Sequence, residues 1–97
     1  MTEYEKLHSE KIYNPGDPEI LKEQTACMER LYDYNMTRPS EGEKRFQMLK
    51  EMFAELGEGC YIEPPLHSNF GGHHVHFGKW IYANYNLTLV DDTHIYV

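Results

Sequence analysis

An apolar residue returns every six positions toward the end of the chain, and this spacing limits the folds open to it. An α-helix repeats about every 3.6 residues and a strand about every 2, so neither explains six. A β-solenoid does, because one short strand and one corner make a side of a coil. A meander of short antiparallel strands would also fit the spacing alone. The residues in phase are Phe77, Ala83, Leu89 and Ile95, with Ile81 and Leu87 in a second register.

The first half of the chain carries signals for helices. Thr2 and Glu5 form a possible capping box, which predicts a short helix through Lys11. Asp17 stands just before a proline, an arrangement typical of a helix start. We expect this second helix to end near Asn35.

A third helix is expected after another capping box, formed by Ser40 and Glu43. Gly57 suits the position just past its end. Basic residues, Arg45 among them, fall on the face opposite its apolar stripe. The stripe consists of Phe46, Leu49, Phe53 and Leu56.

The chain changes character near Gly57, after which glycine, proline and β-favouring residues dominate. We expect one compact α+β unit in which a helical cap, residues 1–57, covers the open end of a β-coil, residues 58–97. Such a cap hides strand backbone that would otherwise be unpaired. The sequence holds about two coils, fewer than a solenoid usually needs. We therefore expect this coil to be truncated, oligomeric or poorly stable.

Charge and composition exclude several classes of partner. The net charge of −7 argues against nucleic acid and anionic membranes, which both attract clustered Lys and Arg. A content of 40% apolar and 26% charged residues is typical of a globular domain. No apolar run approaches a membrane span, and no signal-peptide pattern is evident. Cys27 and Cys60 are expected to be buried free thiols in a reducing cytoplasm rather than a disulfide.

Several segments together resemble the maltose and galactoside O-acetyltransferases, a family of hexapeptide-repeat acyltransferases. They are IEPPL, YANYNLTLVDD, YDYN and PSEGEKRFQMLKEMFAELGE, and the similarity runs from Lys11 to Val97. The resemblance implies a helical cap followed by the first coils of a left-handed parallel β-helix. It also implies transfer from acetyl-CoA to a sugar hydroxyl by a cytoplasmic homotrimer, with acetyl-CoA as co-substrate and no metal.

Four residues take site roles by this resemblance. Asn84 would contact acetyl-CoA and stabilise the oxyanion of the tetrahedral intermediate through its amide NH2. Asp92 would bind the sugar acceptor, because carboxylates accept strong hydrogen bonds from hydroxyls. Asn69 and Asp17 would be further acceptor contacts. Asp17 also fits a helix cap, and Asn84 also fits a left-handed corner of a solenoid. Asp91, by contrast, is expected to be a turn residue.

The resemblance also implies what lies outside these residues. The family's catalytic base is a histidine in a Thr/Ala-Gly-His-Pro motif, which would lie beyond Val97. That histidine would deprotonate the sugar hydroxyl, which then attacks the thioester directly, without a covalent enzyme intermediate. The sequence therefore resembles the front portion of an acetyltransferase. As a 97-residue piece it is expected to be inactive.

A glycine-rich stretch also carries a cluster of histidines, at a corner where the family is usually one residue shorter. His-x-His on a strand puts two imidazoles on one face, which suits zinc or iron, and Asp91 and Asp92 could complete a site. We favour turn and surface histidines and assign no metal ligand. A non-catalytic oligomerising or binding module and a small metal-binding protein remain as alternative functions. The clustered histidines are His67, His73, His74 and His76.

Overall fold

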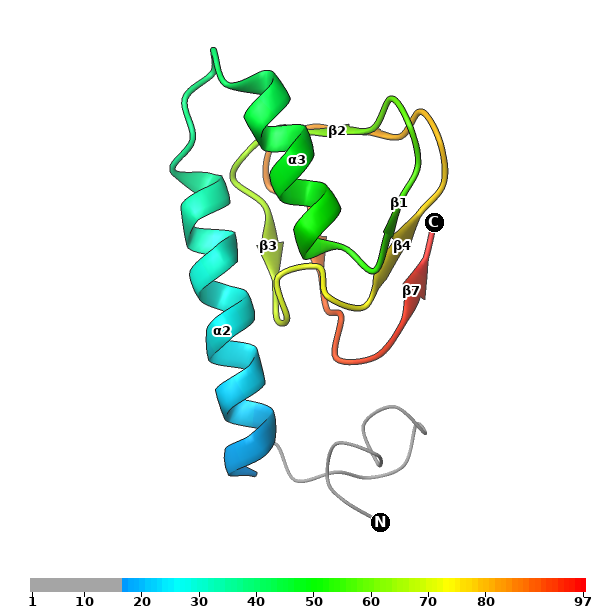
Figure 1. Ribbon diagram of the computed structural model, residues 1–97. Helices are drawn as coiled ribbons and strands as arrows, with labels where there is room; N and C mark the ends of the chain where they lie inside the picture. Colours follow the sequence, from blue (N-terminus) through cyan, green and yellow to red (C-terminus); the bar gives the residue numbers. More distant parts are fainter. Residues whose placement is uncertain (1–16) are drawn as a thin grey trace.

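The computed structural model describes residues 17–97, so the helix expected over residues 2–11 lies outside the described range. Two helices come first in this range, and short strands then follow one another around a three-sided coil (Figure 1). The elements are α2 (Pro18–Asn35), α3 (Gly42–Met52), β1 (Glu55–Leu56), β2 (Tyr61–Ile62), β3 (His67–Ser68), β4 (Val75–Phe77), β5 (Tyr82–Ala83), β6 (Thr88–Leu89) and β7 (Ile95–Tyr96).

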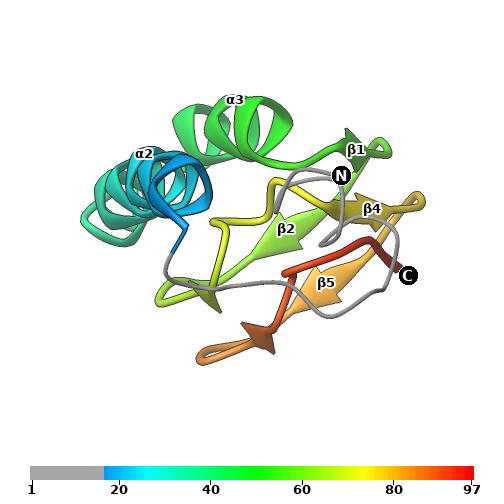
Figure 2. The ribbon, with the colours of Figure 1, turned by 90° about the horizontal axis from the view of Figure 1, so that it is seen from below.

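The strands stack in parallel on three faces, as a solenoid requires. β1, β4 and β7 form one stack, β2 and β5 a second, and β3 and β6 a third. Parallel pairing excludes the antiparallel meander, because a meander would pair consecutive strands. Figure 2 shows the layers from another side, with the helices over the first coil and the second coil beyond it. The expected cap on the β-coil is therefore confirmed.

One corner of the coil is longer than the other two. Strands β1, β2 and β3 begin six residues apart, and three such sides would pair residues 18 apart. Glu55 instead pairs with His76, 21 residues on, and Val75 pairs with Ile95, 20 residues on. The extra residues lie in two stacked loops, residues 69–74 and 90–94, which we call the long corner. The other corners are the short corners.

The long corner changes the meaning of the six-residue period. Phe77 and Ala83 occupy equivalent positions in the coil, as expected. Each is the second paired residue where its strand meets the strand of the preceding coil. Ile95 pairs with Val75 and not with Phe77, so its match to the period does not reflect an equal position in the coil. Ile95 still lies on the same face of the coil as Phe77. The second loop of the long corner adds two residues, and side chains alternate between faces with a period of two along a strand.

Helix α2 begins at the cap that its sequence predicts. The Asp17 carboxylate accepts hydrogen bonds from the backbone N–H groups of Glu19 at 3.0 Å and Ile20 at 3.3 Å. These bonds satisfy donors that a helix start leaves without an intrahelical partner. The buried side chains of the helix follow helical spacing and are Ile20, Cys27, Leu31 and Tyr34.

The end of α2 is tied to the first coil by polar side chains. Tyr34 donates its hydroxyl hydrogen to the carbonyl of Ile62 at 2.6 Å. Asn35 bonds both backbone groups of Leu66, each at 2.8 Å. These contacts fix the helix against the coil. None of the described helices is long and apolar enough to cross a membrane.

Helix α3 differs from the prediction at its start. It begins at Gly42, after Glu41, so Ser40 is not its cap. The Glu41 carboxylate accepts a hydrogen bond from the backbone N–H of Arg38 at 2.7 Å. The preceding turn therefore uses the side chain that stands at the helix start, and no side chain caps the helix itself.

Helix α3 also ends earlier than predicted, at Met52. Leu56 lies in β1, where it pairs with Phe77, so it does not continue the apolar stripe of the helix. Gly57 is not a helix cap, and its N–H donates to the carbonyl of Phe77 at 3.0 Å. Pairing between coils thus takes precedence over the helical pattern. The division into units 1–57 and 58–97 stays a prediction, with β1 on the helical side of that boundary.

The core lies between the helices and the first coil. Cys27 and Cys60 are both buried free thiols, as expected. Burial raises the pKa of the Cys27 thiol, which keeps it protonated. The buried cluster consists of Leu31, Tyr34, Leu49, Met52, Phe53, Cys60, Ile62, Leu66, Val75 and Phe77.

Candidate functional site

Two of the predicted acceptor contacts meet at the long corner. The side-chain amide of Asn69 donates to Oδ1 of Asp92 at 2.9 Å. Asn69 is exposed and Asp92 is half-buried, so the pair stands at the surface. A carboxylate can accept about four hydrogen bonds. The pair therefore has the chemistry to bind a polyhydroxylated ligand.

Asp91, expected as a turn residue, lies next in sequence to this pair in the second loop of the long corner and is completely buried. Its carboxylate accepts hydrogen bonds from the Ser68 hydroxyl, from Phe70 N–H at 2.7 Å and from Gly72 N–H at 2.9 Å. These donors offset the cost of burying a charge. Asp91 thus joins the two loops of the long corner and fixes the position of Asp92.

The alternation of the sequence contained the signal for this burial. Leu87 and Leu89 both pack against the core. Side chains two residues apart share a face of an extended strand, so the same face next receives Asp91. Asp92 then falls on the outer face, where a ligand can reach it.

His74 is buried, which corrects the expectation of a surface histidine. Its Nδ1 lies 2.7 Å from the carbonyl oxygen of Asp91. A carbonyl can only accept, so this nitrogen carries the proton and donates it. Burial lowers the pKa of the imidazole, and the hydrogen bond to Asp91 opposes this effect only in part. His74 is therefore held as a neutral ring inside the long corner.

The predicted His-x-His pair does not form a common ligand set. His76 is half-buried, and its ring contacts Glu55 Oε1 at 2.6 Å and His94 Nδ1 at 2.8 Å. These contacts lie on the outer side of the β1–β4–β7 stack, and His74 meets them only through ring packing on His94, with centroids 5.3 Å apart. Among the described residues, the group whose ligand atoms lie close together is Glu23, His73 and His74.

Asn84 lies on a short corner, between β5 and β6, and not on the corner of Asn69 and Asp92. It is exposed, and its Oδ1 accepts a hydrogen bond from Tyr85 N–H at 2.8 Å. This bond engages the oxygen of the carboxamide, whose NH2 group is its donor. The left-handed backbone expected at this corner occurs at Asn86, whose φ is 67°.

A groove of about 350 Å³ opens beside this short corner. Tyr85 and Glu63 line it together with Arg45, which is only 4% exposed although its helix position predicted the outer face. The Arg45 guanidinium donates to the Tyr61 hydroxyl and the Thr37 hydroxyl, both at 2.7 Å. These bonds satisfy the buried charge and fix helix α3 to the coil.

The remaining predicted residues have simpler surroundings. Asp17 acts as the cap of α2, and its role as an acceptor contact stays a prediction. His67 is exposed, as expected, and its Nε2 lies 3.1 Å from Asn86 Oδ1. The structure therefore brings Asn69 and Asp92 together but leaves Asn84 and Asp17 on other elements.

Comparison with known proteins extends these observations. The family model described as the maltose acetyltransferase hexapeptide capping motif matches residues 6–57. The galactoside O-acetyltransferase of Lactococcus lactis is 49% identical over 94 residues, which cover 97% of this chain and 45% of that protein. The chain thus spans about half the length of the curated relatives it matches.

Solved structures agree with the sequence relatives. A galactoside acetyltransferase in complex with coenzyme A is 34% identical with a TM-score of 0.89, over 99% of this chain and 48% of that one. A maltose O-acetyltransferase from Clostridium difficile 630 is 31% identical with a TM-score of 0.92, over 97% of this chain and 50% of the other. Because the capping-motif model matches more than half of the residues, the chain belongs to the maltose and galactoside O-acetyltransferase family of hexapeptide-repeat proteins.

Proposed function

We propose that this chain provides the acceptor-binding part of an acetyl-CoA-dependent O-acetyltransferase that acts on sugar hydroxyls. The observation that carries the proposal is the surface pair of Asn69 and Asp92, fixed from below by buried Asp91. A rigid carboxylate beside an amide can hold adjacent sugar hydroxyls in one orientation. A relative solved with coenzyme A supports a coenzyme A thioester as the acetyl donor.

The chemistry would proceed by direct transfer. Asp92 accepts a hydrogen bond from the sugar and orients it, while a histidine base removes the proton of the reacting hydroxyl. The hydroxyl oxygen attacks the thioester carbonyl, and Asn84 NH2 donates to the oxyanion that forms. Collapse of this intermediate releases the coenzyme A thiolate, which takes up the proton from the base. These 97 residues contain no Gly-His-Pro sequence to supply that base.

The proposed assembly comes from the family resemblance, which implies a homotrimer with active sites between subunits. Asn84 and the Asn69–Asp92 pair lie on different corners of the coil. An active site between subunits would let one protomer supply the acceptor contacts and its neighbour the base. We therefore propose a homotrimer built on a left-handed parallel β-helix. The buried free thiols, Cys27 and Cys60, support a location in the reducing cytoplasm.

The test measures acetyl transfer from acetyl-CoA to galactosides, glucose and maltose by the full product of the gene. We expect Asn84→Ala to lower kcat by about 10²–10³-fold, the usual effect of losing one oxyanion donor. Asp92→Asn should mainly raise KM for the sugar. Asn86→Gly is the matched control, because it changes a neighbouring corner asparagine and keeps the left-handed backbone accessible.

Two results would contradict this proposal. One is a full gene product that transfers no acetyl group to any of these sugars. The other is an Asn84→Ala variant with the activity of the Asn86→Gly control. The 97-residue polypeptide alone is expected to show no turnover, because it has no histidine in the required motif.

A further inference from the structure

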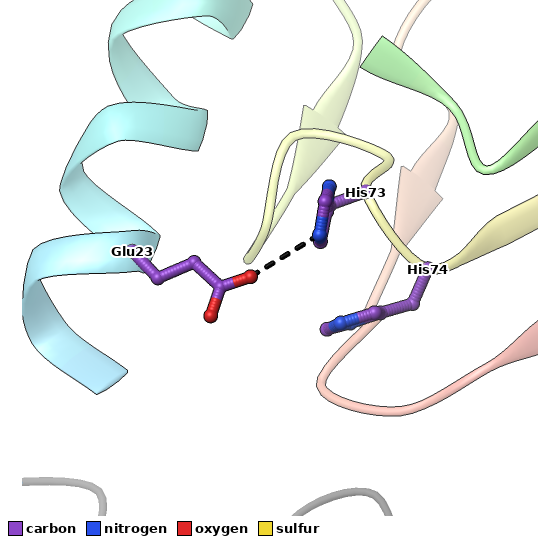
Figure 3. Close-up of side chains that lie close together, drawn as sticks. All are labelled: Glu23, His73 and His74. Atoms are coloured by element: carbon purple, nitrogen blue, oxygen red, sulfur yellow. Dashed lines mark ion pairs between the residues drawn. The ribbon is translucent and has the colours of Figure 1, made fainter. Parts of the chain in front are cut away.

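Three potential metal ligands converge between helix α2 and the long corner (Figure 3). Glu23 comes from the helix, and His73 and His74 come from the first loop of the corner. His73 Nε2 lies 3.2 Å from Glu23 Oε1. One ligand atom from each residue lies within 4.8 Å of the other two. Residues 50 positions apart in sequence thus present two imidazole nitrogens and one carboxylate oxygen to one point.

The backbone of the loop explains how neighbouring histidines face the same way. Side chains of adjacent residues on a strand point to opposite faces. Here Gly71 and Gly72 take φ values of 61° and 90°, and His73 N–H donates to the carbonyl of Phe70 at 2.9 Å. This turn carries both imidazoles toward α2. Contact of the two rings, with centroids 5.0 Å apart, keeps them together.

The protein also orients the buried ligand. His74 Nδ1 donates to the carbonyl of Asp91 at 2.7 Å, so Nε2 is the basic nitrogen of the ring. Metal-binding histidines usually donate their second N–H to a carbonyl or carboxylate in this way, which fixes the tautomer and the ring. Asp91 in turn is held by backbone N–H groups. The hydrogen bonds that would orient His74 as a metal ligand are therefore present in the structure.

We propose that Glu23, His73 and His74 bind one divalent transition-metal ion, with zinc as the best match, and that the ion fastens α2 to the long corner. Two histidines and one glutamate are a known zinc ligand set, and a fourth position can be taken by water. With bonds of about 2.0–2.2 Å, ligand atoms around tetrahedral zinc lie roughly 3.3 Å apart. The Glu23–His73 distance already meets this spacing, and a small closing movement suffices for the third ligand. The role is structural and independent of acetyl transfer.

The test is calorimetric titration of the chelator-treated chain, made without a polyhistidine tag, with zinc chloride. We expect one zinc ion per chain. Glu23→Gln and His73→Ala should each weaken zinc binding by at least about tenfold. Losing a residue that only hydrogen-bonds to a ligand already lowers metal affinity by about this factor, and losing a ligand itself should lower it further. Both side chains are partly exposed, so these variants should fold. His74→Asn removes the third ligand and keeps a donor toward Asp91.

The other histidines provide matched controls. His76 and His94 contact each other and could bind zinc adventitiously, so His76→Ala tests that alternative and keeps His94, whose ring packs on His74. His67→Ala changes a remote exposed ring. Both controls should leave the affinity unchanged. The proposal is overturned if the chain binds no zinc, or if binding is lost in a control and kept in Glu23→Gln and His73→Ala.

A second measurement tests the fastening role. Zinc should raise the Tm of the unmodified chain and of both controls, because an ion that binds only the folded state stabilises it. Glu23→Gln and His73→Ala should show no such rise. Equal stabilisation in these variants and the unmodified chain would contradict a metal bridge between α2 and the long corner.

Discussion

The short corners and the long corner of the coil are held by different forces. The short corners close largely through the backbone, as in Trp80 N–H to Glu58 C=O at 2.8 Å and Asn86 N–H to Pro65 C=O at 3.0 Å. The long corner adds three residues in one loop and two in the next, and a buried carboxylate organises them. Where the coil departs from its period, polar side chains replace the regular ladder. The Asn69–Asp92 pair and two of the three proposed zinc ligands, His73 and His74, lie at this departure.

Removing the carboxylate of Asp91 should destabilise the long corner more than any other substitution proposed for it. Asp91→Ala leaves the N–H groups of Phe70 and Gly72 buried without their acceptor, so we expect a loss of about 3–5 kcal/mol in the free energy of unfolding. Urea denaturation of the 97-residue chain measures it. Asp91→Asn keeps one acceptor oxygen and should lose less.

Asp92→Ala is the control for that experiment. Asp92 is half-buried at the surface, so its removal should cost less than about 1 kcal/mol. Equal losses in Asp91→Ala and Asp92→Ala would show that the buried carboxylate does not hold the long corner.

A methyl group at Gly72 should be the next most damaging change. The residue has a φ of 90°, and a Cβ there would overlap the Phe53 ring. We expect Gly72→Ala to cost about 2–3 kcal/mol from strain and overpacking. Gly42→Ala, with no atom within 4 Å, should instead stabilise α3 by up to about 1 kcal/mol. Thermal unfolding that ranks the two variants in the opposite order would refute this account.

An alanine placed at a left-handed residue of a short corner should lower the free energy of unfolding less than Gly72→Ala. Asn86 holds a φ of 67°, so Asn86→Ala should lose about 1 kcal/mol. Asn86→Gly should be nearly neutral, since glycine accepts this conformation. Chemical denaturation compares the two. If Asn86→Ala costs as much as Gly72→Ala, the short corner is not the more tolerant of the two.

The long corner should also respond to pH in the absence of metal. Burial lowers the pKa of His74 below its ordinary value of 6.5. The unfolded chain therefore binds a proton that the folded chain does not, so this contribution to stability is complete above pH 6.5 and is lost as pH falls toward the folded pKa.

This effect of pH on stability is expected to be smaller than the losses in Asp91→Ala, Gly72→Ala and Asn86→Ala. The measurement is the free energy of unfolding against pH in the presence of chelator, for the unmodified chain and for His74→Asn. The variant should lose less stability on acidification. His67→Gln, at an exposed ring, should keep the full dependence, and an unaltered slope in His74→Asn would refute the assignment.

Local patterns predicted the parts of the fold that depend on neighbouring residues. Asp17 caps α2 because a helix start needs an acceptor within two or three residues. The capping box at Ser40 failed because Glu41 serves the preceding turn. Gly57 failed as a helix end because pairing with the next coil determines that segment. The candidate site was found by resemblance, and its pair of Asn69 and Asp92 is now joined by a hydrogen bond.

By itself, the sequence determined that short strands recur at six residues under a helical cap, since side-chain phase repeats locally along the chain. Only the tertiary structure decided the length of the long corner, the hydrogen bonds that hold the Asp91 carboxylate and the meeting of Glu23 with His73. Those contacts join residues at least 19 positions apart. A local pattern does not encode them, because they exist only after the coils have stacked and α2 has packed against them.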